Sequence, residues 1–387
     1  MLELTSRQRV VREQARAFAT DEVAPVAAER YRRGEYPIDL VRRMGELGLI
    51  GLPFPREYGG QGMGLVELCL AIEEVGRVDQ SLGITLESAV SLGAMPILRF
   101  GSAAQRQRWL PALVSGEQVA GFGLTEPTGG TDTAGLHTRA ERDGDGWVID
   151  GRKAWIGNAG SPITSHVTIT AATGEDEVTN FIVPADTPGF ILGARNDLVG
   201  WRTIDNRHLD FDGCRLPDDH RLGDVGAGLA NFLTILDAGR VAIAALAVGL
   251  IQGCLDACSE HAVERRAFDR PIGSFQAVAF TVADLAASAQ LCRDAYLRAA
   301  WLHDQGRPFT TEAAIAKLRC TEEAVSAARA ATQVFGGLGF SRESAVGRFY
   351  MDAKILEIGE GTSEVQRLVI AQGLGLPIRP DGSVPPH

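Results

Sequence analysis

The first part of the chain spaces its apolar residues as amphipathic helices do. In PIDLVRRMGELG, the residues Leu40, Met44 and Leu47 share one helical face. Gly48 follows them, as glycine commonly does at the end of a helix. The same helical spacing of apolar residues, again followed by a terminal glycine, occurs in LVELCLAIEEVG and SAAQRQRWLPALVSG. The pattern therefore predicts a helical region over about residues 1–115.

The pattern changes to short strands at about residue 118 and back to long helices at about residue 226. HTRAER, GWVIDG, HVTITAAT, VTNFIVP and HLDFDG are separated by Gly, Pro, Asp and Asn, which favours a compact antiparallel β domain. The most apolar stretch, at 241–255, is too short to span a bilayer and predicts a buried helix. This order of elements predicts an α+β multidomain protein. The predicted domains are residues 1–117, 118–226 and 227–387, the last with a loose tail.

Composition and motif spacing exclude several classes of function. The chain has 387 residues and a net charge of −11, which argues against nucleic acid and anionic membrane as partners. The six cysteines contain no CxxC pair and the seven histidines have no metal-ligand spacing, so we expect a reduced, cytoplasmic protein without a structural metal. The first residues, MLELTSRQRVVREQ, contain no apolar signal core. A P-loop motif is absent, and no predicted strand leads into Gly60, Gly62 and Gly64, which argues against a nicotinamide-type Rossmann unit.

Two stretches beside predicted strands carry candidate binding chemistry. GFGLTEPTGGTD closes a strand, and its backbone N–H groups with the Thr125 and Thr131 hydroxyls would suit a flat polar ring or a phosphate. GRKAWIGNAG places Trp155 in a turn, where it is either ordinary core or a surface for stacking a ring system.

A third stretch, ILEIGEGTSEVQR, places Glu360 between two glycines. A capping box that begins at Ser363 predicts a helix directly after it. From these residues alone, Glu360 is either a solvated loop acid or a carboxylate brought close to another group by the freedom of its flanking glycines.

Together, the motifs of this chain resemble the acyl-CoA dehydrogenase family over nearly the whole length. The family resemblance implies a helical N-terminal domain, a central β domain and a C-terminal four-helix bundle, assembled as a homotetramer (a dimer of dimers). The motifs that carry it, in the family's order, are GLIGLPFPREYGG (48–60), LTEPTGGTD (124–132), GRKAWIGNAG (151–160), LDAGR (236–240), ERRAFDRPIGSFQA (264–277), QVFGGLGF (333–340) and DAKILEIGEGTSEVQR (352–367).

The resemblance also implies a bound FAD. The residues that would contact it from the same chain are Phe122, Leu124, Thr125, Gly130, Thr131, Trp155, Ile156, Gly157, Thr362, Ser363 and Glu364. Those that resemble the residues reaching FAD in a neighbouring subunit are Arg265, Phe268, Gln276, Gln333, Gly336 and Gly337. Without the motif, Arg265 would be read as a solvated helix end.

Glu360 matches the family's catalytic base, which removes the α-proton of an acyl thioester while a hydride leaves the β-carbon for flavin N5. The family's other base position is occupied here by Gly239. The positions that match substrate contacts are Thr131, Asp237, Arg240 and Gly361. From spacing alone, Asp237 and Arg240 would form a plain intrahelical pair.

Two residues depart from the family pattern. Gly157 stands where a Thr or Ser usually directs a hydroxyl at flavin N5, and Gly359 stands where a bulky residue often precedes the base. We expect an acyl-CoA or acyl-carrier-protein thioester as substrate and an electron-transferring flavoprotein as acceptor. The alternatives are an oxygen-using flavin oxidase, which Gly157 favours, and a nucleic-acid-binding relative, which the net charge of −11 disfavours.

Overall fold

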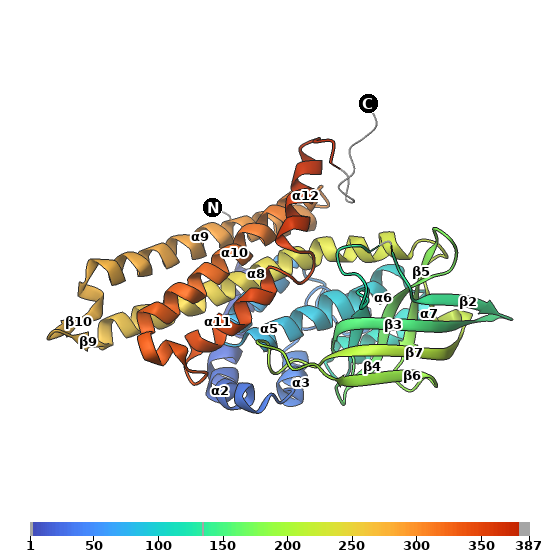
Figure 1. Cartoon of the computed structure of the whole chain (residues 1–387), viewed down its shortest axis with the longest axis horizontal. Coiled ribbons are helices and arrows are strands. Elements are labelled where there is room, and N and C mark those ends of the chain that lie inside the picture. The colour runs from blue at the N-terminus through green and yellow to red at the C-terminus, as the bar shows by residue number, and fades with distance from the viewer. Residues whose placement is uncertain (1–2, 134, 379–387) are drawn as a thin grey trace.

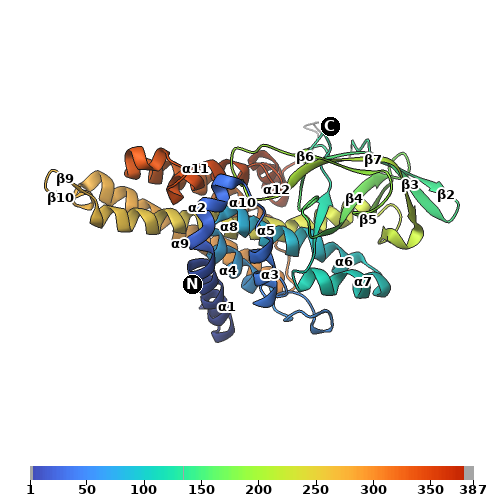
Figure 2. The ribbon, with the colours of Figure 1, turned by 90° about the horizontal axis from the view of Figure 1, so that it is seen from below.

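The computed structural model describes residues 3–133 and 135–378 and shows helices, then a sheet, then helices (Figure 1). Its first helices lie against the middle of the molecule, and the sheet lies at one end of it (Figure 2). The N-terminal helices are α1 Ser6–Phe18, α2 Ala24–Arg33, α3 Ile38–Glu46, α4 Leu65–Gly76, α5 Gln80–Glu87, α6 Met95–Phe100 and α7 Ala103–Val114, with π-helical segments at Ala19–Val23 and Ser88–Ala94.

The local sequence sets the ends of these helices. Thr5 and Gln8 form a capping box at the start of α1, and Ser102 and Gln105 form another at the start of α7. Gly48, predicted to end the third helix, lies just beyond it with φ +71°.

The central region is one sheet with the strand order β6-β7-β3-β2-β4-β5-β8, and β1 also pairs with β4. Most pairs are antiparallel, as predicted, but β1 and, at one residue pair, β2 run parallel to β4. A tight hairpin would force two strands to pair antiparallel. Because β2 and β3 come between β1 and β4 in the sequence, no hairpin joins them and a parallel pairing is possible. The strands are β1 Val119–Gly123, β2 Arg139–Asp143, β3 Gly146–Gly157, β4 Thr164–Ala172, β5 Val178–Pro184, β6 Phe190–Arg195, β7 Asn206–Pro217 and β8 Arg221–Leu222.

The C-terminal region is a four-helix bundle of α8 to α11, followed by the shorter α12. A small hairpin, β9–β10, lies at the end of the bundle remote from the sheet (Figures 1 and 2). These elements are α8 Gly228–Glu264, β9 Arg266–Ala267, β10 Arg270–Pro271, α9 Gln276–Asp304, α10 Thr310–Phe335, α11 Ala345–Leu356 and α12 Ser363–Gly373.

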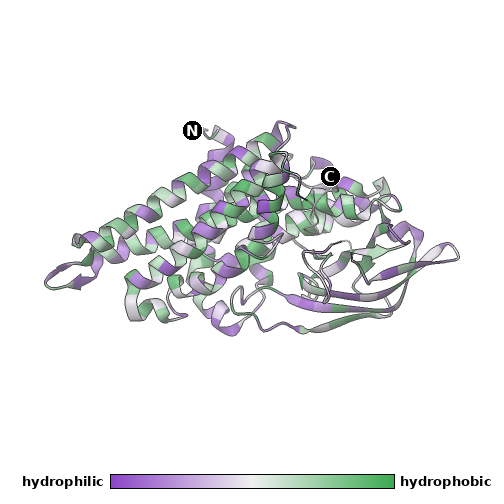
Figure 3. Cartoon of the chain, turned by 45° about the horizontal axis from the view of Figure 1, so that its top comes forward, coloured by the Kyte–Doolittle hydropathy of each residue, from purple (hydrophilic) through white to green (hydrophobic). Residues whose placement is uncertain are grey.

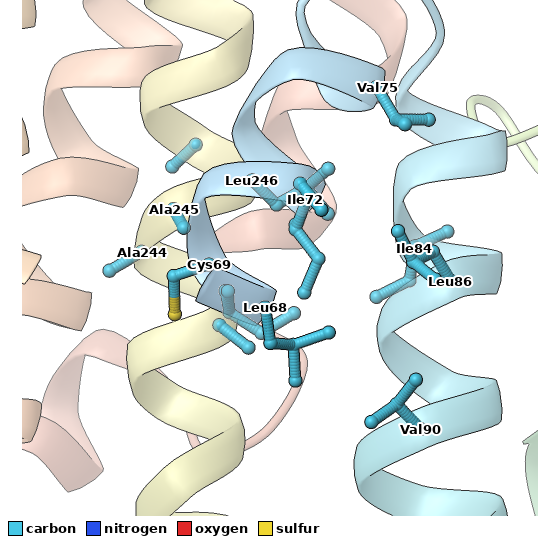
Figure 4. Packing of buried hydrophobic residues seen from close by; sticks show 14 of the residues in the cluster. Leu68, Cys69, Ile72, Val75, Ile84, Leu86, Val90, Ala244, Ala245 and Leu246 are labelled. Atoms are coloured by element: carbon cyan, nitrogen blue, oxygen red, sulfur yellow. The ribbon is translucent and has the colours of Figure 1, made fainter. Parts of the chain in front are cut away.

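The helical core forms where α4, α5 and α8 meet. Leu68 and Ile72 of α4 pack near Leu246 of α8 (Figure 4). Figure 3 shows apolar and polar residues interspersed along the long helices. The segment 241–255 is a mostly buried part of α8, as predicted.

Among the described residues, two helical stretches are long and apolar enough to cross a membrane, judged by length and composition alone. They are Gln80–Phe100 and Gly228–Glu264, and 78% of the most apolar window of each is buried inside the fold. Core helices of a folded domain have the same property.

Candidate active site

The turn between α11 and α12 places Glu360. Glu360 has φ +54° and Gly361 has φ +94°, both in the left-handed region. The φ of Gly361 would strain any residue with a side chain, and an added Cβ would also lie 2.7 Å from Gln366 Nε2. Lys317 Nζ and Gln366 Nε2 donate hydrogen bonds to the Gly361 carbonyl oxygen at 2.7 and 2.9 Å. The turn is therefore held from both α10 and α12.

The helix after this turn begins one residue earlier than its capping pattern predicted. The Thr362 hydroxyl accepts from the Val365 N–H at 3.3 Å, so Thr362 rather than Ser363 is the N-cap. The left-handed Gly361 turns the chain into the helix at Thr362. Ser363 is buried and its hydroxyl has no hydrogen-bond partner among the described residues, while Glu364 is exposed.

The Glu360 carboxylate is buried. Both of its oxygens are inaccessible to solvent and lack hydrogen-bond partners within the described ranges. Burial raises the pKa of Glu360 to about 7, while the positive charges of Lys317 and Arg240 act in the opposite direction. The interpretation of Glu360 as a solvated loop acid is therefore wrong.

Gly239 of α8 makes room for this carboxylate. A Cβ atom at Gly239 would lie 2.1 Å from Glu360 Oε2, far inside van der Waals contact. The two positions at which the family carries its base are thus side by side, and one of them must be small for Glu360 to lie as it does.

Glu87, at the end of α5, is a second acid at this place. It is fully buried, and both burial and the neighbouring Glu360 raise its pKa well above the usual value for glutamate. Sequence reasoning missed Glu87, although a signal existed, because it is the sole charged residue between Gln80 and Leu98. It also missed Lys317, which no local pattern marks.

Asp237 and Arg240 form the intrahelical pair that their spacing predicted, with Arg240 Nη1 2.5 Å from Asp237 Oδ1. Thr310 Oγ1 donates to the other carboxylate oxygen of Asp237 at 2.8 Å. Arg240 Nε is buried without an acceptor among the residues described. The arginine therefore keeps a donor available beside the carboxylate of Glu360.

A buried ion pair anchors the loop after β1. Lys153 Nζ lies 2.8 Å from Glu126 Oε1, and Glu126 also accepts from the N–H groups of His137 and Thr138. Burial lowers the pKa of Lys153 to about 8, against the effect of Glu126. Neither residue of this pair was picked out from the sequence. The pair ties the loop to β3 and leaves Thr131 exposed on it.

The other residues of this loop have different surroundings. Thr125 is half-buried, and its carbonyl oxygen accepts from the Ala154 N–H at 2.9 Å. Leu124 is buried and Gly130 is exposed. Phe122, on β1, stacks its ring on Phe232 of α8 with centroids 3.9 Å apart.

Trp155 lies within β3 rather than in the turn that was predicted. Its φ of +63° falls at a bulge in the pairing with β7, and the bulge directs the indole outward, where it is 57% exposed. The next residue, Ile156, is buried in the core of the sheet. At Gly157, an added Cβ would meet no described atom within 4 Å. An exposed aromatic face therefore lies beside open space.

The remaining FAD-type residues lie at the opposite end of the bundle. Arg265, Phe268 and Gln276 are exposed on and beside the β9–β10 hairpin, Phe268 to 89%. Gln333, Gly336 and Gly337 are exposed at the end of α10 and directly after it. The rings of His261 and Phe335 stack with centroids 4.2 Å apart. This contact holds the residues near the β9–β10 hairpin beside those at the end of α10. Within one chain, that end is remote from the sheet, whose strand β3 carries Trp155 (Figure 1).

These features define a class of protein. The chain has a β domain between two helical regions and a buried carboxylate at the α11–α12 turn. This arrangement is the one expected of acyl-CoA dehydrogenases. The N-terminal, middle and C-terminal domain descriptions of that family match residues 5–117, 121–214 and 226–375. The chain belongs to the acyl-CoA dehydrogenase family, and the family prediction from its motifs is confirmed.

Particular relatives agree with this assignment. The probable acyl-CoA dehydrogenase YngJ of Bacillus subtilis is 46% identical over 96% of this chain and 99% of its own length. The mitochondrial short-chain specific acyl-CoA dehydrogenase of Mus musculus is 38% identical over 96% of this chain and 90% of its own. The butyryl-CoA dehydrogenase structure from Megasphaera elsdenii matches with a TM-score of 0.93 and 35% identity, covering 97% and 99% of the two chains. The chain is thus an enzyme, a flavoprotein oxidoreductase of fatty acid metabolism.

Proposed function

We propose that this enzyme dehydrogenates short-chain acyl-CoA thioesters between the α- and β-carbons, with Glu360 as the base that takes the α-proton. The observation that carries the proposal is the buried Glu360 carboxylate, whose oxygens have no hydrogen-bond partner in the described part of the chain. A carboxylate in that state is free to accept a proton from a substrate. The preference for short chains rests on the short-chain and butyryl-CoA relatives.

The surroundings of Glu360 suit a general base. Burial brings its pKa to about 7, close to a neutral working pH. Because the base must be ionised, activity rises with pH through this value. Lys317 and Arg240 favour the ionised form by their positive charge, so the base is available without a solvating shell of water.

The backbone beside the base supports stabilisation of the thioester carbonyl. Among the described residues, the Glu360 N–H donates to no acceptor. In the left-handed turn this N–H is available for a substrate oxygen as negative charge develops there. Asp237, Arg240, Thr131 and Gly361 would hold the rest of the thioester and its pantetheine arm.

The chain also has features that fit FAD. Trp155 offers an exposed aromatic face, Gly157 leaves space beside it, and the Ser363 hydroxyl is unpaired within the described ranges. When bound, FAD would accept the hydride that leaves the β-carbon. Residues around Phe122–Thr131, Trp155–Gly157 and Thr362–Glu364 would hold it from one chain.

The remote group around Arg265 and Gln333 would complete the FAD site of a neighbouring subunit. Its residues are exposed at the far end of the bundle, and Phe268 and Phe340 expose 89% and 96% of their surface there. Apolar side chains exposed to this degree are typical of a contact surface. We therefore propose a homotetramer, with an electron-transferring flavoprotein as the acceptor.

A second candidate function is oxidation of the thioester with molecular oxygen as the electron acceptor. A third is dehydrogenation of an acyl group that is bound to a carrier protein instead of CoA. The observation that favours an oxidase is the open space at Gly157, where a hydroxyl residue would fit but is not present.

The proposed function is tested by anaerobic mixing of the purified yellow protein with butyryl-CoA. We expect flavin absorbance to bleach in the wild type. Glu360→Gln should keep its flavin and slow bleaching by about 10²–10⁴-fold, as loss of a general base does. The matched control is Glu357→Gln, which alters an acid of the same turn that pairs with Lys354. Normal bleaching in Glu360→Gln would show that another group is the base.

A further inference from the structure

Glu87 and Glu360 bring two carboxyl groups together in the protein interior. Glu87 ends α5 at the point where the helix widens into the π-helical segment Ser88–Ala94, and its exposed fraction is 0%. π-helical turns inside helices are frequent at functional sites. The two side chains lie within hydrogen-bonding reach of each other, although Glu87 ends a helix near the start of the chain and Glu360 lies in the turn before α12.

Within the described part of the chain, only serine hydroxyls act on Glu87 besides Glu360, and no hydroxyl acts on Glu360. Glu87 Oε1 and both Glu360 oxygens lack partners among the residues that the structure describes, and Glu87 Oε2 meets the Ser88 hydroxyl only at 3.4 Å. Lys317 donates to the Gly361 carbonyl oxygen and Arg240 to Asp237, so these cations act on Glu360 by charge rather than by contact.

Two adjacent buried carboxyl groups cannot both be ionised at neutral pH. If one is neutral, its O–H can donate to the other, which satisfies an oxygen of each. The cations decide which group ionises first, because Lys317 and Arg240 face Glu360, whereas the groups that act on Glu87 are Glu360 and the hydroxyls of Ser88 and Ser91.

We infer that Glu87 remains protonated and donates its carboxyl proton to the Glu360 carboxylate, so that Glu87 is a positioning residue for the base. The inference rests on the proposed function of Glu360. In turnover the α-proton passes to Glu360, and Glu87 keeps its own proton throughout. The donated hydrogen bond fixes the direction of the carboxylate and stabilises its charged form.

The directions of the pKa values agree with this assignment. Burial and the charge of Glu360 raise the pKa of Glu87 well above its usual value. Burial raises the pKa of Glu360 to about 7, and the hydrogen bond from Glu87 lowers it, as Lys317 and Arg240 do. The two groups titrate as a pair, and Glu87 is the neutral member over the range in which Glu360 ionises.

The test is the pH dependence of flavin reduction by butyryl-CoA in three forms of the whole enzyme. Glu87→Gln keeps a hydrogen-bond donor and should keep the wild-type midpoint. Glu87→Leu removes the donor and should move the midpoint upward by about one to two pH units, with activity recovered at high pH. An unchanged midpoint in Glu87→Leu, or a downward shift of about one unit in Glu87→Gln, would overturn the inference.

A second measurement needs no turnover. Infrared difference spectra over a pH titration should show a protonated buried carboxyl group in the wild type above the midpoint of Glu360, and Glu87→Gln should lack it. Absence of this band from the wild type would contradict the inference, even where Glu87→Leu fails to fold. Failure of the proposed function is distinct, because it appears as normal flavin reduction in Glu360→Gln.

Discussion

A single methyl group on α8 should disable this enzyme without unfolding it. In Gly239→Ala, the new Cβ would lie 2.1 Å from Glu360 Oε2, whereas ordinary contacts begin at 3.4 Å. The obstructed atom is the end of a flexible side chain, so the fold can yield by moving the carboxylate. In the middle of a helix, alanine is also favoured over glycine by about 1 kcal/mol.

The magnitude follows from the displacement that the methyl group imposes. Oε2 must withdraw by about 1.3 Å, the difference between 3.4 and 2.1 Å. A displacement of about 1 Å at a reacting group costs on the order of 10²-fold in rate. This corresponds to about 2.7 kcal/mol of transition-state stabilisation. We therefore expect Gly239→Ala to slow flavin reduction on the order of 10²-fold, with an unchanged or higher melting temperature.

The assay is anaerobic stopped-flow reduction of the flavin, with flavin content and thermal unfolding measured on the same preparations. Gly359→Ala is the matched control, because it makes the same change directly beside the base. Its Cβ would meet only the Ile355 carbonyl oxygen, at 3.6 Å, among the described atoms. We expect a near wild-type rate for it. Equal rates in both variants would refute the steric argument, and a lower melting temperature in Gly239→Ala would show that the fold, not the base, had yielded.

Three further variants test other parts of the proposal. Gly157→Thr fits the open space at that position and should slow reoxidation of the reduced flavin in air, and an unchanged rate would remove the support for an oxidase. Gly359→Tyr should shift kcat/KM toward straight over branched thioesters by about tenfold, and an unaltered ratio would mean that Gly359 does not shape the acyl site. Arg265→Ala should lose flavin and oligomer, measured by absorbance and light scattering, whereas Arg266→Ala keeps both. Retention of both by Arg265→Ala would exclude an interface role.

Local patterns in the sequence predicted the parts of this structure that depend on local contacts. The helix–sheet–helix order and the buried middle of α8 follow from apolar periodicity, and the Asp237–Arg240 pair follows from helical spacing. The position of Glu360 just before a helix was also predictable, because glycines and a capping sequence surround it.

The features that sequence did not predict depend on contacts between distant segments. The outward turn of Trp155 is set by a bulge against β7, and the direction of β1 by its place beside β4. Glu87 and Lys317 act on Glu360 from α5 and α10, so their roles depend on how the helices pack. A lone acid in an apolar helix predicts that the acid is buried, but the sequence does not show which residue it contacts.

The backbone at Glu360 also bears on how this chain would respond to selection. Its φ of +54° lies where a residue other than glycine costs about 1–2 kcal/mol, and the burial of its carboxyl group adds to this cost. Thermal stability therefore favours glycine at position 360, whereas catalytic turnover requires glutamate there. A population of variants selected only for survival at high temperature should accumulate glycine at position 360 and become inactive. Thermal stabilisation of this enzyme should be sought elsewhere in the chain, with activity screened at every round.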